Sequence, residues 1–231
     1  MGNNNHILLN TKNIKIRYPI LNFLISFIIF IILYSMISVL FSKLSFNFDV
    51  KKTLIAKRIT QGLLYFIFIN FLHRKNSVKC DYFRSINIKT LIIVVLIMFF
   101  LYFLYENTIQ ILIDRYFTYK IEDTTDSIER IFSNPIAAFL QVCVIAPIAE
   151  EMLIRGYFFK TLNVRYTIFQ TLIITSIFFA LFHFDFMNTI FYLIIGIFLG
   201  IVFIETKSII YCIILHFSLN FYVFISYYIN K

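Results

Sequence analysis

The chain has 231 residues, of which 60% are hydrophobic and only 14% are charged. A soluble domain carries about 25% charged residues, so this composition excludes an ordinary soluble protein and predicts an all-α, polytopic bundle of transmembrane helices. The net charge of +9 does not indicate nucleic-acid binding, because the basic residues lie in short clusters between apolar segments, as expected for loops at an anionic lipid surface.

Seven apolar segments predict about seven membrane spans in a single membrane domain, residues 1–231. Their approximate bounds are 20–41, 54–72, 90–112, 136–158, 166–184, 189–205 and 208–228. The first is too long for the core of a signal peptide and is expected to be a retained span. The second is the weakest, because Lys57 and Arg58 would lie within it, and an interfacial helix over 42–58 is the alternative. Residues 1–130 carry no specific motif.

The distribution of charge bears on orientation in the cell membrane. A cytoplasmic N-terminus places the very basic loop 73–89 inside and the acidic loop 114–130 outside, as the positive-inside rule requires. The basic residues between 43 and 58 would then lie outside, which opposes the rule. We expect the N-terminus to be cytoplasmic.

The fourth segment contains two adjacent glutamates inside an apolar run. Ionisable groups at membrane depth are costly unless they are paired or face water, so they are candidates for function. On a helix, Glu151 and Arg155 are i,i+4 and can pair on one face, while Glu150 is rotated by about 100° and points elsewhere. Glu150 is thus available as a general base. The alternative is a structural Glu–Arg ion pair with a second, interfacial glutamate.

Two later segments carry buried-looking histidines. His183 ends the fifth segment, and His216 and Asn220 are i,i+4 in the seventh. Each alone could be an ordinary interhelical hydrogen bond. At 1.5 Å per residue, Glu150, His183 and His216 lie roughly 20, 27 and 15 Å from turns on one membrane face. Helix tilt would have to bring them to one level.

Three motifs carry a resemblance to a known family. In order and spacing they resemble those of the CAAX protease and bacteriocin-processing (CPBP, or Abi) family of intramembrane endopeptidases, which includes the type II CAAX prenyl endopeptidases. The resemblance covers residues 136–225 and predicts a catalytic core there. The motifs are Glu150-Glu151-x-x-x-Arg155, Phe179-x-x-x-His183 and His216-x-x-x-Asn220.

The resemblance implies a role for each residue. Glu150 would activate water, with Glu151 and Arg155 as its supporting pair. His183 and His216 would polarise the substrate or bind a metal. The implied activity is hydrolysis of a peptide bond in a hydrophobic or membrane-associated peptide, with roles in peptide maturation or bacteriocin self-immunity.

The same resemblance implies that Asn220 stabilises the substrate or an oxyanion and that Phe179 shapes the wall of the site. Glu150, His183 and His216 resemble a zinc ligand set. A glutamate that activates water directly needs no metal, and the sequence leaves both mechanisms open.

Two other functions and serine catalysis are alternatives to this interpretation. A non-catalytic immunity or scaffold protein that acts by binding a partner remains the main alternative. A proton-linked transporter subunit is disfavoured by the low glycine content. Serine catalysis is disfavoured because Ser176 and His183 are i,i+7, about 10 Å apart along a helix axis.

Overall fold

The fold is helical throughout the residues that the structure describes. It is a computed structural model, which describes residues 17–44, 50–76, 78, 86–116, 131–183, 185 and 188–229. Every regular element in these ranges is a helix, which confirms the predicted all-α class. Six helices are long and apolar enough to cross a membrane, and a seventh apolar helix is shorter. The chain is therefore a multi-pass membrane protein.

The helices follow one another in chain order with few described loops. Two continuous helical segments of the described chain, 88–116 and 135–162, contain three π-helical stretches, in which the backbone hydrogen bonds reach five residues back. The elements are α1 (Pro19–Leu44), α2 (Val50–Lys75), α3 (Ile88–Tyr105), η2 (Glu106–Gln110), α4 (Ile111–Tyr116), α6 (Pro135–Ala138), η3 (Phe139–Ile145), α7 (Ala146–Glu151), η4 (Met152–Phe159), α8 (Lys160–Leu162), α9 (Ile168–Phe182), α10 (Thr189–Thr206) and α11 (Ile209–Ile229).

The second predicted span, 54–72, lies within an observed helix, whereas its interfacial alternative and the fifth predicted span differ from the structure. The interfacial helix over 42–58 is wrong, because α1 continues to Leu44 and a new long helix, α2, begins at Val50 and includes Lys57 and Arg58. The fifth segment forms α9, which has only 15 residues and at about 1.5 Å per residue is shorter than a bilayer core. The loops that underlie the predicted orientation lie largely outside the described residues.

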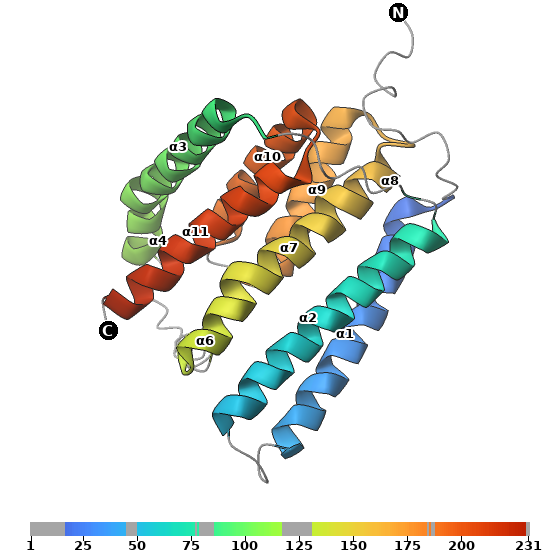
Figure 1. Cartoon of the computed structure of the whole chain (residues 1–231). Coiled ribbons are helices and arrows are strands. Elements are labelled where there is room, and N and C mark those ends of the chain that lie inside the picture. The colour runs from blue at the N-terminus through green and yellow to red at the C-terminus, as the bar shows by residue number, and fades with distance from the viewer. Residues whose placement is uncertain are drawn as a thin grey trace, which may run out of the picture.

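The long segment α6–α8 runs through the middle of the bundle (Figure 1). The hairpin of α1 and α2 lies along one side of it, and α3 with α4 lies at the far side beyond α11. Aromatic rings hold α1 in place: Phe23 stacks on Phe158 of η4, and Phe27 stacks on Phe182 of α9. The outer faces remain apolar and exposed, as expected of surfaces that contact lipid.

Helices α9 and α10 pack closely because small residues separate their backbones. Gly196 and Gly200 form a G-x-x-x-G spacing on α10, which permits close approach of two helices. A Cβ on Gly196 would lie 3.2 Å from the Cα of Ser176, and one on Gly200 would lie 2.3 Å from Cδ1 of Leu172. This contact brings the C-terminal end of α9, where His183 lies, against the first turns of α10.

Candidate active site

The two adjacent glutamates lie in α7, between the π-helical stretches η3 and η4. The stretch η3 ends just before Pro147, which has no N–H and so leaves the carbonyl of Cys143 without the usual i→i−4 hydrogen bond. One residue earlier, the N–H of Ala146 donates to the carbonyl of Gln141, five residues back. Within α7 the two carboxylates diverge: the side chain of Glu151 is fully buried, whereas that of Glu150 is 32% exposed.

Glu151 is the centre of a buried polar network. One of its oxygens, Oε1, accepts a hydrogen bond of 3.0 Å from Nη1 of Arg155, as the i,i+4 spacing predicts. Nδ1 of His216, on α11, lies 3.1 Å from the same oxygen. A carboxylate only accepts hydrogen bonds, so the His216 Nδ1–H is the donor. The network fixes the imidazole and leaves its Nε2 free to face the cavity.

Arg155 also joins α7 and η4 to two other helices. Its Nη2 donates a 2.9 Å hydrogen bond to the carbonyl of Gly196 on α10. Its guanidinium lies 4.7 Å from the ring centroid of Phe179 on α9, a cation–π contact. A fully buried charge is tolerated only when it is paired and hydrogen-bonded, and both conditions are met here.

His183 directly follows the last residue of α9 and is oriented by two contacts. Its Nδ1 lies 2.7 Å from the carbonyl of Phe179, so Nδ1 carries the proton and Nε2 faces Glu150. Its ring stacks on that of Tyr192 of α10, with centroids 3.9 Å apart and an interplanar angle of 18°. The imidazole is therefore held both by hydrogen bonding and by stacking.

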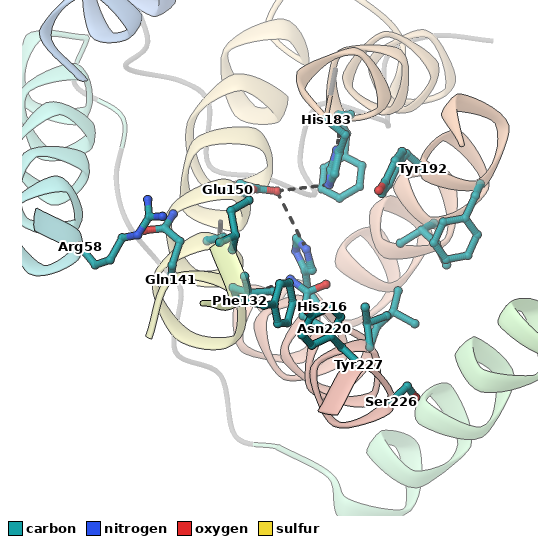
Figure 2. A pocket seen from close by; sticks show the side chains of 18 of the residues that line it. Arg58, Phe132, Gln141, Glu150, His183, Tyr192, His216, Asn220, Ser226 and Tyr227 are labelled. Atoms are coloured by element: carbon teal, nitrogen blue, oxygen red, sulfur yellow. Dashed lines mark hydrogen bonds and ion pairs between the residues drawn. The ribbon is translucent and has the colours of Figure 1, made fainter. Parts of the chain in front are cut away.

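The three predicted catalytic side chains meet at one point (Figure 2). Oε2 of Glu150 lies 3.9 Å from Nε2 of His183 and 4.0 Å from Nε2 of His216. Both separations are longer than a direct hydrogen bond and fit a single small oxygen ligand between the three groups. The packing of α7, α9 and α11 therefore brings together three residues whose expected depths along their helices differ.

These side chains line a large cavity of ≈ 930 Å³. Asn220 lines it too, and its amide nitrogen donates to the carbonyl of Val142 in η3 at 2.9 Å. This bond uses one N–H of the amide, and the second N–H can donate to another acceptor. Phe179 also lines the cavity. Pockets that hold drug-sized ligands measure about 300–1,000 Å³, so several residues of a peptide would fit.

The same residues fit a metal ion. One donor atom from each of Glu150, His183 and His216 lies within 4.8 Å of the others. Two imidazoles and one carboxylate form the ligand set of many catalytic zinc sites. The Nδ1 hydrogen bonds to Glu151 and to the Phe179 carbonyl are the kind of support that metal-bound histidines have. The geometry therefore suits both a bound zinc ion and a directly activated water.

Comparison with known proteins agrees with the site. Residues 132–222 match the family model described as "Type II CAAX prenyl endopeptidase Rce1-like". The predicted family resemblance is confirmed. The Rce1-like segment contains all seven residues of the three motifs, and α1, α2 and α3 lie outside it. A search of curated proteins and a search of solved structures find no match.

Sequence reasoning missed three residues that the structure adds to the site. Tyr192 stacks on His183, the Gly196 carbonyl binds Arg155, and Arg58 of α2 lines the cavity. The G-x-x-x-G spacing could have singled out Gly196, but no local pattern places Arg58 beside residues of the C-terminal half. Ser176 is fully buried and donates to the carbonyl of Leu172, which agrees with its exclusion as a nucleophile.

Proposed function

We propose that the chain is an intramembrane endopeptidase in which Glu150 activates a water molecule for attack on a peptide bond. The observation that carries this proposal is the convergence of one carboxylate and two imidazoles, from three helices, on a cavity inside a bundle with apolar outer faces. The Rce1-like match supports a protease of the CAAX type. The substrate is then a hydrophobic or membrane-associated peptide.

In this mechanism each side chain has a defined task. The Glu150 carboxylate takes a proton from the water as its oxygen adds to the carbonyl carbon. The neutral Nε2 of His183 accepts a hydrogen bond from the same water, which orients it. Glu150 then returns the proton to the leaving amine nitrogen as the C–N bond breaks.

The negative charge that forms on the carbonyl oxygen also has partners. Protonated His216 can donate from Nε2, and the buried Glu151 carboxylate stabilises the charge on that imidazolium. Asn220 offers its second amide N–H. With a zinc ion bound by Glu150, His183 and His216, the metal would supply Lewis-acid polarisation and a more acidic water. The orienting contacts of the two imidazoles serve either case.

The cellular role and the orientation remain part of this proposal. Peptide maturation and bacteriocin self-immunity both require cleavage of a hydrophobic peptide at a membrane, and they fit a cavity enclosed by lipid-facing helices. A cytoplasmic N-terminus in the cell membrane agrees with the charges of the two long loops in the sequence.

The decisive experiment compares peptides from cells that express the native protein, Glu150→Gln or Glu205→Gln. Glu205 is an exposed glutamate at the end of α10 and is the matched control. A general base contributes about 10²–10⁴-fold to rate, so products seen with the native protein and the control should vanish with Glu150→Gln. Native turnover by Glu150→Gln would reject Glu150 as the base, whereas the absence of such products from all three strains would favour a protein that acts by binding.

The purified enzyme then tests the metal. Activity that is lost with a chelator and restored by Zn²⁺ would assign the ion to the site. Unchanged activity after exhaustive chelation, with no zinc detected by elemental analysis, would assign direct activation of water by Glu150.

A further inference from the structure

Glu150 lies at the junction of two compartments. Besides the large cavity, it lines a smaller one of ≈ 250 Å³ on the side of α1 and α2. Tyr34 and Phe179 also line both compartments, so the two compartments lie side by side at the carboxylate. A peptide whose carbonyl carbon is attacked beside Glu150 therefore has the smaller compartment next to its scissile bond.

The walls of the smaller compartment are almost entirely apolar. Among the described residues that line it, only Glu150 carries a carboxylate and none has a basic side chain. The remaining polar groups are two tyrosine hydroxyls. Aliphatic and aromatic side chains from α1, α2, η4 and α9 make up the rest. A charged or amide side chain would be desolvated there with few polar groups as partners, which costs free energy.

The size of this compartment matches one large side chain. Benzene binds in engineered apolar cavities of about 150 Å³, and sites for drug-sized ligands begin at about 300 Å³. A volume of ≈ 250 Å³ is therefore suited to a leucine, methionine or phenylalanine side chain and not to a segment of several residues. The large cavity takes the rest of the peptide.

Stacked aromatic rings hold the walls in place. Phe30 lies 4.3 Å from Tyr65 between ring centroids, and Phe27 lies 4.0 Å from Phe182. Phe30 is only 2% exposed. A wall of packed rings cannot collapse easily, so the compartment keeps a fixed volume and can select by size.

We propose that this compartment is the specificity pocket of the peptidase, and that it binds one large apolar side chain of a residue that flanks the scissile bond. The inference rests on the proposed function and adds the substrate class. Because Phe27, Phe30, Ile31 and Tyr34 lie on α1 and Tyr65 on α2, helices outside the Rce1-like match supply half of the residues that line the pocket and share in its selectivity.

Ile31 offers a way to change the pocket without disturbing the core. It lines the compartment and is 38% exposed, whereas its neighbour Ile32 is 54% exposed and does not line it. Ile31→Phe fills the pocket and Ile31→Ala enlarges it. Ile32→Phe and Ile32→Ala are the matched controls on the same helix.

The test uses a tryptic digest of a bacterial proteome as a peptide library, with purified protein in maltoside micelles and Glu150→Gln as the blank. Mass spectrometry of the new termini gives the residues on both sides of each cut. The native protein should prefer leucine, methionine or phenylalanine at one flanking position. One methylene in an apolar pocket changes selectivity by about 10–200-fold, so Ile31→Phe should shift the Phe-to-Ala preference towards alanine by at least about tenfold.

Ile31→Ala should shift the preference in the opposite direction and admit tryptophan, and both Ile32 variants should match the native profile. Identical profiles for all variants would overturn the pocket and leave the peptidase intact. A uniform loss of rate with Ile31→Phe, accompanied by loss of co-purified phospholipid, would show that the compartment holds a lipid chain and would also overturn it. Absence of any Glu150-dependent cut would overturn the peptidase and the pocket together.

Discussion

Replacement of Arg155 by methionine tests the buried network, because it removes the charge and keeps much of the side-chain volume. The carboxylate of Glu151 would stay buried without its main partner, and loss of one member of such a pair costs about 3–5 kcal/mol. The carbonyl of Gly196 would also lose its donor, at a cost of about 1–3 kcal/mol. Together these costs of about 4–8 kcal/mol should shift the unfolding equilibrium by roughly 10³–10⁶-fold.

A second substitution separates the two contributions. The double variant Glu151→Gln/Arg155→Met has neither charge of the buried pair, so it should regain the stability that Arg155→Met loses through the broken pair. Its remaining destabilisation should come only from the Gly196 carbonyl. In the native protein Oε2 of Glu151 and Nε of Arg155 have no hydrogen-bond partner among the described residues. The pair is therefore incompletely compensated, and a neutral replacement is tolerated.

The assay is unfolding in mixed dodecyl sulfate and maltoside micelles. Far-UV circular dichroism follows it, since the chain contains no tryptophan. The control is Arg115→Met on α4, where the arginine is exposed and a change within about 0.5 kcal/mol is expected. If Arg155→Met unfolds at the same detergent composition as this control, or if the double variant is no more stable than Arg155→Met, the account of the network is wrong.

Two further substitutions test how the site is positioned. Tyr192→Leu removes the ring stacked on His183, a contact worth about 0.5–1.5 kcal/mol. The kcat/KM of this variant should therefore fall by about 2–12-fold, while that of Tyr192→Phe stays near native. Equal losses in both variants would contradict the stacking role. Gly196→Ala places a Cβ 3.2 Å from the Cα of Ser176, and because backbone cannot yield cheaply it should cost about 1–3 kcal/mol in the same unfolding assay. Gly200→Ala meets only the end of a flexible leucine side chain and should cost less, and the reverse order would refute this view of the helix contact.

The parts of the fold and site that follow local rules could be predicted from sequence. The lengths of the apolar segments predicted the helices, and the i,i+4 spacing predicted the Glu151–Arg155 pair. In the structure the two paired atoms lie 3.0 Å apart. The bond from His216 to Glu151 could not be predicted, because it depends on how α11 lies against α7. The π-helical stretches were also missed, since Pro147 permits several local irregularities and only packing selects one.

The contribution of the N-terminal helices was hidden for a similar reason. Residues 1–130 carry no motif, yet Tyr34 and Arg58 line the large cavity, and α1 supplies four residues to the wall of the smaller one. A pocket wall needs only apolar residues of suitable size, and in a membrane protein those residues look like any lipid-facing ones. Catalytic chemistry restricts residue type and is visible in sequence, whereas a shape-selective wall is not.

The way the charges are satisfied explains why we propose Glu150, and not Glu151, as the reactive carboxylate. Glu151 and Arg155 are fully buried and bonded to each other, to His216 and to a backbone carbonyl. Glu150 is next to them in sequence, but within the described part of the chain its closest ionisable partners are imidazole nitrogens 3.9 and 4.0 Å away. One carboxylate stabilises the framework and the other keeps its lone pairs for a proton. A chain that paired both carboxylates would be a more stable bundle with no base to offer a substrate.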